Sequence, residues 1–231
     1  MQNNWQKIWN ERQLETTVKS TLQQLIAVDG FDGNCGGIDE TAWMEYVESL
    51  AAKLQITPKD SIFEVGCGAG AFLYPFYQKG NRVAGIDYSE KLAKIALYIM
   101  PRADISVGEA INIPNEPTFD IVVANSVFFY FNDYEYAAGV LSHMLQIATK
   151  RVGIFDVPDL SKKEEAIILR KAKLGEAEYE EKYRGLEHLY YSKEWFQQVL
   201  ANKPVKVMIE DQAITNYGNS RYRFNVFIDK L

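Results

Sequence analysis

A short apolar run that opens into a glycine-rich turn is the part of this sequence best suited to chemistry. Residues 62–70 read Ile-Phe-Glu-Val-Gly-Cys-Gly-Ala-Gly. Glycines at alternate positions permit positive φ values and let a ligand approach the backbone with no Cβ in the way. Asp87 ends the next apolar run, about 20 positions beyond Gly66, where a carboxylate can accept hydrogen bonds from a ribose diol. The spacing therefore predicts a nucleoside site.

The charge of Glu64 bears on which nucleoside is bound. Glu64 lies two residues before Gly66, where its carboxylate would repel a pyrophosphate and attract an ammonium or sulfonium group. Gly66-x-Gly68-x-x-Ala71 also satisfies the relaxed dinucleotide fingerprint. The acidic turn favours S-adenosylmethionine as cofactor, and an NAD(P)-dependent oxidoreductase is the alternative.

Two further motifs follow in order along the chain, Gly108-Glu109-Ala110 and the apolar run 119–125. Together with the glycine turn and Asp87, they resemble the class I S-adenosylmethionine-dependent methyltransferases over residues 62–156. The resemblance implies that the glycines border the methionine portion, Asp87 takes the ribose hydroxyls, and Glu109 with Ala110 approaches the adenine edge. The predicted cofactor-binding residues are Glu64, Gly66, Gly68, Gly70, Asp87, Tyr88, Glu109, Ala110 and Asn125.

Aromatic residues and one histidine are the candidates for acceptor chemistry. Residues 125–128 read Asn-Ser-Val-Phe, whereas family members that methylate a base nitrogen or a glutamine amide carry Pro-Pro-aromatic there, so that class is disfavoured. Tyr130 follows, where an aromatic ring can contact the acceptor or the sulfonium methyl. His188 is predicted as the general base or acceptor-orienting residue, because imidazole titrates near neutral pH. The other histidine, His143, is predicted to be a surface or core-edge residue of a helix that covers the sheet.

No metal is predicted. Asn125 and Asp156 end neighbouring strand-like runs, and hard oxygen ligands suit Mg²⁺, but one amide and one carboxylate are too few. Cys35 and Cys67 are the only cysteines, and they make neither a disulfide framework nor a metal-ligand cluster. We expect free thiols in a reducing cytosol.

Alternating strand-like and helical runs position these residues. Strands are predicted at 61–65, 82–87, 104–107, 119–125, 152–156, 205–214 and 221–228, and helices at about 70–79, 89–99 and 133–148, with Ser89 and Asp133 as N-caps. The loop at 216–220 contains glycine and favours an antiparallel hairpin between the last two strands. The fold class is therefore α/β, with a doubly wound, mostly parallel seven-stranded sheet and a reversed C-terminal strand hairpin.

The chain is predicted to be a single domain with additions around the cofactor-binding core. The core covers residues 58–158. An N-terminal helical cap or lid (1–57) precedes it, with the turn-rich segment 29–37 as a candidate hinge or lid. A cap insertion (159–191) follows, with a capping-box pattern at Ser161 to Glu164 that predicts the start of a helix. The C-terminal helix and strand hairpin occupy residues 192–231.

Composition limits the partners. The formal net charge of −6 gives no general attraction to nucleic acid or to an anionic membrane, and no apolar run approaches the ~20 residues of a membrane span. We expect a cytoplasmic monomer or homodimer that encloses a small-molecule acceptor and methylates an oxygen or nitrogen. A non-catalytic S-adenosylmethionine-binding protein and a protein or RNA methyltransferase are further alternatives.

Overall fold

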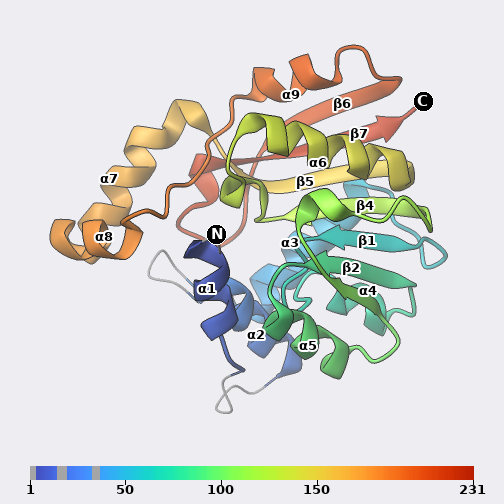
Figure 1. Cartoon of the computed structure of the whole chain (residues 1–231), viewed down its shortest axis with the longest axis horizontal. Helices are drawn as coiled ribbons and strands as arrows, with labels where there is room; N and C mark the ends of the chain where they lie inside the picture. The colour runs from blue at the N-terminus through green and yellow to red at the C-terminus, as the bar shows by residue number, and fades with distance from the viewer. Residues whose placement is uncertain (1–3, 15–19, 33–36) are drawn as a thin grey trace.

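A seven-stranded sheet forms the centre of the computed structural model, which describes residues 4–14, 20–32 and 37–231 (Figure 1). Its strand order is β3-β2-β1-β4-β5-β7-β6. The strands are β1 (Ile62–Val65), β2 (Val83–Asp87), β3 (Asp104–Val107), β4 (Phe119–Asn125), β5 (Ala148–Pro158), β6 (Val205–Asp211) and β7 (Arg223–Lys230). Strands β1 to β5 pair in parallel, and β7 is antiparallel to both of its neighbours. The predicted sheet with a reversed C-terminal hairpin is confirmed.

Helices cover both faces of the sheet. They are α1 (Asn4–Glu11), α2 (Thr21–Ile26), the π-helical η1 (Ala27–Phe31), α3 (Glu40–Lys53), α4 (Tyr74–Gln78), α5 (Glu90–Ile99), α6 (Tyr134–Ile147), α7 (Lys163–Leu174), α8 (Glu176–Tyr183) and α9 (Lys193–Leu200). Single 3₁₀ turns are η2 (Ala110–Asn112), η3 (Phe128–Tyr130), η4 (Leu160–Lys162) and η5 (Ser220–Tyr222). Among the described residues, no helix is both long and apolar enough to cross a membrane.

Two hydrophobic cores lie on opposite faces of the sheet. One contains buried side chains of α3 and α5, and the other contains those of α6 and α9. Side chains alternate between the faces along a strand, so Ile62 of β1 joins the first core and Phe63 joins the second. Strands β1 and β2 are buried along their whole length, which explains their unbroken apolar sequences.

Several local predictions are confirmed and others are corrected. Ser89 and Asp133 accept N-cap hydrogen bonds at the starts of α5 and α6. The helix predicted from residue 70 begins at Tyr74, because the preceding turn contains glycines with positive φ. The capping-box prediction at Ser161 is wrong. Asp159 accepts hydrogen bonds from the Ser161 N and Oγ, and α7 begins at Lys163 without a side-chain cap.

The N-terminal segment packs against the second strand–helix unit. Gln6 Nε2 donates to the Tyr88 carbonyl at 3.0 Å, and Ser89 Oγ donates to Asn10 Oδ1 at 2.7 Å. These bonds fix α1 over the end of β2 and the start of α5. Part of the predicted hinge, including Cys35, lies outside the described residues, so the lid stays a prediction.

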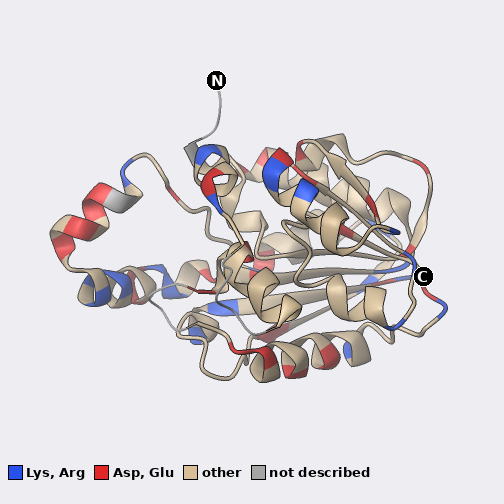
Figure 2. Ribbon diagram, turned by 90° about the horizontal axis from the view of Figure 1, so that it is seen from below, with Lys and Arg blue, Asp and Glu red and all other residues tan. Residues whose placement is uncertain are grey.

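The cap insertion projects from the edge of the sheet toward which β1 to β5 point (Figure 1). Its two ends are joined by hydrogen bonds from Leu160 N to the Tyr191 carbonyl and from Tyr191 N to the Pro158 carbonyl. Gly175, at φ +86°, separates α7 from α8. Figure 2 shows that α8 is coloured largely red, for acidic residues, and that α7 carries several blue, basic segments. Lys171 of α7 joins the two helices by ion pairs to Glu176 and to another glutamate of α8.

Trp43 provides a test of how α3 supports the glycine turn. Its side chain is fully buried, and its indole Nε1 donates to the Ala71 carbonyl at 3.1 Å. Truncation of a large buried aromatic side chain typically costs about 3–5 kcal/mol. We expect Trp43→Ala to lower the free energy of unfolding by about that amount in denaturant titrations. Tyr98→Ala is the matched control, since Tyr98 is 80% exposed; equal effects of the two variants would contradict this role.

Candidate functional site

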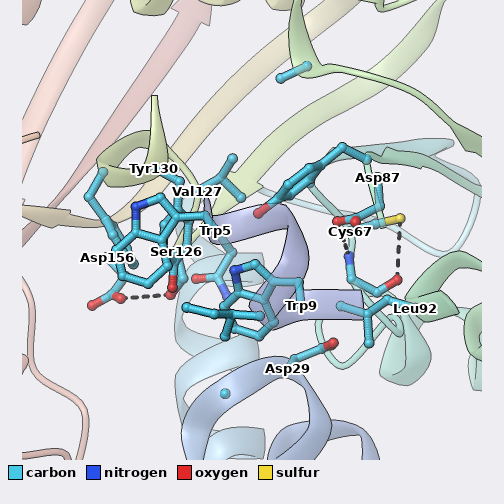
Figure 3. Close-up of a pocket in the computed structure, with 18 of the residues that line it drawn as sticks. Trp5, Trp9, Asp29, Cys67, Asp87, Leu92, Ser126, Val127, Tyr130 and Asp156 are labelled. Carbon is cyan, nitrogen blue, oxygen red and sulfur yellow. Dashed lines mark hydrogen bonds between the residues drawn. The ribbon is translucent and has the colours of Figure 1, made fainter. Parts of the chain in front are cut away.

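The carboxyl ends of the parallel strands open into a cavity of about 320 Å³. The turn after β1 and the ends of β2, β4 and β5 form its floor, while α1, η1 and the cap insertion supply its walls. In Figure 3, Asp87 and Cys67 lie on one side of the cavity, and Asp156 and Ser126 lie on the other. This is the edge of an open α/β sheet at which ligands bind.

The glycine turn has the predicted geometry. Gly66, Gly68 and Gly70 have φ values of +66°, +53° and +94°. Gly66 and Gly68 line the cavity, whereas Gly70 does not. A Cβ at Gly70 would lie 2.3 Å from Met100 Cε, so the absence of a side chain there serves helix packing.

Asp87 connects this turn to the next helix. Its Oδ2 accepts a hydrogen bond from Gly68 N at 2.8 Å, and its Oδ1 accepts one from Ser89 N at 2.7 Å. The side chain is buried, and desolvation raises its pKa to about 6 although both backbone bonds oppose that rise. Each carboxylate oxygen keeps a further lone pair, so Asp87 can still accept from hydroxyls in the cavity.

Asp29 is a site residue that sequence reasoning missed. Its Oδ1 and Oδ2 accept hydrogen bonds from Ala69 N at 2.6 Å and from Ala71 N at 2.9 Å. A Cβ at Gly68 would lie 2.4 Å from Asp29 Oδ1. The position of Asp29, some 40 residues earlier in the chain, therefore leaves room only for glycine here. Desolvation raises the pKa of Asp29 to about 7. The aspartate stands in a turn-rich segment, and nothing in its local pattern indicates this long-range contact.

Glu64 completes an acidic cluster, which we define as Asp29, Glu64 and Asp87. Glu64 is 2% exposed, and its Oε2 has no hydrogen-bond partner among the described residues. Desolvation, followed by the charges of Asp29 and Asp87, raises its pKa well above the usual range. Within the described chain, no lysine or arginine forms an ion pair with this cluster. A cluster of this kind favours a cationic ligand.

The remaining predicted cofactor residues also line the cavity. Tyr88 has a buried hydroxyl without a hydrogen-bond partner in the described part of the chain. Glu109 is exposed and accepts from Tyr136 Oη at 3.4 Å, and Ala110 begins η2 beside it. Asn125 Oδ1 accepts from Tyr46 Oη at 2.9 Å. These groups offer both donors and acceptors at the carboxyl ends of β2, β3 and β4.

The opposite end of the cavity is built around a buried ion pair. Asp156, at φ +57°, accepts from Ser126 Oγ at 2.6 Å and from Gln212 Nε2 at 2.8 Å. Arg223 Nε lies 3.7 Å from Asp156 Oδ1, and both side chains are almost fully buried. Asp156 therefore has a counter-charge and hydrogen-bond donors, unlike the acidic cluster.

His188 and Tyr130 come together at this end. His188 stacks on Trp5, with ring centroids 4.9 Å apart and planes inclined by 9°, and the Tyr130 ring lies 4.8 Å from Trp5. Arg170 Nη1 lies 3.3 Å from His188 Nδ1. Because a guanidinium only donates, Nδ1 must accept, and the proton of the neutral imidazole is on Nε2.

Charge also favours a neutral His188. Burial, followed by the neighbouring Arg170 and Arg223, lowers its pKa well below the usual range. His188 thus offers an N–H donor to the cavity. The other histidine, His143, contacts the Ile111 carbonyl through Nδ1 at 2.8 Å and does not line the cavity.

Sequence reasoning also missed Trp5, Trp9, Arg170 and Arg223 as cavity residues. Trp5 and Trp9 both belong to α1. Their spacing of one helical turn was a usable signal that both rings face one side. Among the described residues, no three His, Cys, Asp or Glu side chains form a group that could hold a metal.

Comparison with protein families finds a match to the methyltransferase domain model over residues 63–149. An uncharacterized methyltransferase of Alkaliphilus oremlandii (strain OhILAs) is 29% identical over 86 residues, which are 37% of this chain and 40% of that protein. The match therefore spans less than half of that relative's length.

Solved structures share the fold over much more of the chain. Magnesium protoporphyrin IX methyltransferase from Synechocystis PCC 6803 with bound S-adenosylhomocysteine (SAH) has a TM-score of 0.63 at 18% identity, covering 98% of this chain and 92% of that one. The plantazolicin methyltransferase BpumL in complex with SAH also has a TM-score of 0.63, at 17% identity, covering 83% and 85%. The fold expected from the sequence is thus found in both proteins.

Substitutions at two glycines with positive φ distinguish the effect of backbone strain from the effect of losing the contact with Asp29. A Cβ at Gly68 meets Asp29, whereas one at Gly80 (φ +87°) meets nothing within 4 Å. We expect Gly80→Ala to show only the strain of a left-handed residue, about 1–2 kcal/mol. Gly68→Ala should cost more and should abolish hydrogen-exchange protection of the Ala69 and Ala71 amides. Retained protection of both amides in Gly68→Ala would contradict the proposed contact.

Proposed function

We propose that this chain, a class I S-adenosylmethionine-dependent methyltransferase by domain and fold, transfers a methyl group to an oxygen or nitrogen atom of a small-molecule acceptor. The observation that supports this most directly is the acidic cluster. Its three carboxylates face one cavity, and the described residues give them no cationic partner. A ligand with an ammonium and a sulfonium group supplies the missing positive charge.

The residues present fit this cofactor. The unpartnered Glu64 Oε2 and the oxygens of Asp29 stand beside the glycine turn, where the methionine portion would lie. Asp87 has free lone pairs for the ribose hydroxyls, and the unpartnered Tyr88 hydroxyl lies in the same cavity. We assign Glu109, Ala110 and Asn125 to the same site from their family positions, and Gly66 and Gly68 to its floor.

The bound cofactor would supply an activated methyl group on a positively charged sulfur. The task left to the protein is to align an acceptor with that methyl and to exclude water. Tyr130 and the two tryptophans of α1 provide apolar walls. We propose that His188 orients the acceptor by donating a hydrogen bond from its Nε2–H. In this role it does not remove a proton from the acceptor.

The lining of the cavity supports a small acceptor. Segments on either side of the core, α1 and the cap insertion, both contribute to its lining. A protein or RNA methyltransferase and a non-catalytic S-adenosylmethionine-binding protein are the alternatives within this family. An NAD(P)-dependent oxidoreductase is disfavoured because a pyrophosphate would face the acidic cluster. A cytoplasmic location and a monomeric or homodimeric state stay predictions from the sequence.

Cofactor choice tests the proposal directly. We expect isothermal titration calorimetry to show binding of S-adenosylmethionine and SAH, and no binding of NADH under the same conditions. Tritium transfer from labelled S-adenosylmethionine to a panel of small acceptors then distinguishes an enzyme from a binding protein. Binding of NADH without binding of S-adenosylmethionine would overturn the proposal.

Replacement of Asp87 tests the ribose contact. Hydrogen bonds to charged groups contribute about 1.5–3 kcal/mol, so Asp87→Ala should weaken S-adenosylmethionine binding at least about tenfold by calorimetry. Asp104→Ala is the matched control, since Asp104 is an exposed aspartate on the adjacent β3 and lies outside the cavity. An unchanged dissociation constant in folded Asp87→Ala would remove this residue from the site.

The raised pKa values predict opposite pH effects on folding and on binding. Asp87 and Asp29, with pKa values of about 6 and about 7, hold protons in the folded state that they lose when unfolded. Stability of the free protein should therefore fall as pH rises from about 4 to 7. Binding of a cation needs the ionised carboxylates, so S-adenosylmethionine affinity should rise about tenfold between pH 5 and pH 7.

Thermal unfolding with and without the cofactor, together with calorimetry across this pH range, measures both effects. The Asp87→Asn variant should lose part of the rise in affinity, because one titrating carboxyl group of the acidic cluster is then absent. An affinity that falls from pH 5 to pH 7 would contradict an anionic cofactor site.

A further inference from the structure

Arg170 is a buried cation whose charge the described residues leave unpaired. It is on α7 of the cap insertion, is 5% exposed and lines the cavity. Its Nη1 contacts His188 Nδ1 at 3.3 Å, and its Nη2 donates to Tyr190 Oη at 3.0 Å. Both partners are neutral side chains. No Asp or Glu of the described chain lies within ion-pair distance of its guanidinium.

The second arginine at this end of the cavity, Arg223, does have an ion-pair partner. Arg223 pairs with Asp156, and it also donates to the Asp156 carbonyl at 3.4 Å. Asp156 is in turn held by Ser126 and Gln212. With Arg223 and Asp156 compensating each other, Arg170 leaves this end of the cavity with a net charge of about +1.

The groups around Arg170 form a receptor for a planar anion. A guanidinium presents five N–H donors in a plane and matches a carboxylate in two-point contact. Arg170 contacts the Nδ1 edge of His188, so the Nε2–H of that ring points away from the guanidinium and is a separate, neutral donor. The His188 ring is flanked by Trp5 and by Phe129, whose centroid lies 5.0 Å away at an interplanar angle of 81°. Aromatic faces of this kind accommodate a flat apolar body.

We propose that this end of the cavity binds the carboxylate of a flat, largely apolar acceptor, with Arg170 as the anion-binding residue. The inference rests on the proposed function, since it names the substrate class of the same cavity. An unpaired cation in a buried site is costly, and a substrate carboxylate removes that cost on binding. The acidic cluster at the other end repels the same anion, so charge also sets the direction in which the acceptor enters.

Matched pairs of acids and amides test this inference. Benzoate, 2-naphthoate and indole-3-acetate are compared with their primary amides by calorimetry in the presence of SAH. We expect the unaltered protein to bind at least one acid at least about tenfold more tightly than its amide, as a charge-assisted contact implies. Arg170→Gln should abolish that preference, and Arg170→Lys, which keeps the charge, should retain part of it.

Arg184→Gln is the matched control, because Arg184 belongs to the same insertion, is exposed and lies outside the cavity. It should keep the full preference for acids. Equal binding of each acid and its amide to the unaltered protein would overturn the inference without any variant, as would a preference that persists in Arg170→Gln. SAH titrations of each protein distinguish this failure from failure of the proposed function, which would appear as absent cofactor binding in the unaltered chain.

Discussion

Burial of carboxylates around a glycine turn is the constraint on which the rest of this structure depends. Asp87 accepts the amide of Gly68 on one side and that of Ser89 on the other, so one side chain joins the turn after β1 to the start of α5. Asp29 holds the other half of the turn through two more amides and brings the N-terminal segment over it. These contacts order the turn but bring buried carboxyl groups together, and the pKa of the neighbouring Glu64 is raised by its own burial and by the charges of Asp29 and Asp87. Burying these carboxyl groups together costs folding free energy, and it creates a site that favours a cation.

The two ends of the cavity differ in charge because they are built from different parts of the chain. The acidic end belongs to the cofactor-binding core and to the segment that precedes it. The opposite end takes Arg170 from the cap insertion and Arg223 from the start of β7. Insertions above the carboxyl edge can change without disturbing the sheet. Under the proposed function, the core binds the cofactor and the insertion lies beside the acceptor.

Features with a local physical cause could be predicted from the sequence. The positive φ values of the glycine turn, the N-caps at Ser89 and Asp133, and the reversed hairpin all follow from residues close together in the chain. The cap assigned to Ser161 was wrong because Ser161 donates both its N–H and its hydroxyl to Asp159, two residues earlier, which caps the 3₁₀ turn η4. Asp29 and Arg170 could not be found, since their roles arise from contacts between segments whose separation no local pattern encodes.

His188 illustrates why a residue type alone does not determine a chemical role. Imidazole suggests a base because its unperturbed pKa lies near neutrality, yet the neighbour at Nδ1 is an arginine, which can only donate. That single contact fixes the tautomer, and the two nearby guanidinium groups disfavour the protonated form. A histidine held in this way is a poor proton acceptor and a good hydrogen-bond donor. These electrostatics are consistent with the proposed role of His188, which is to orient an acceptor and not to take its proton.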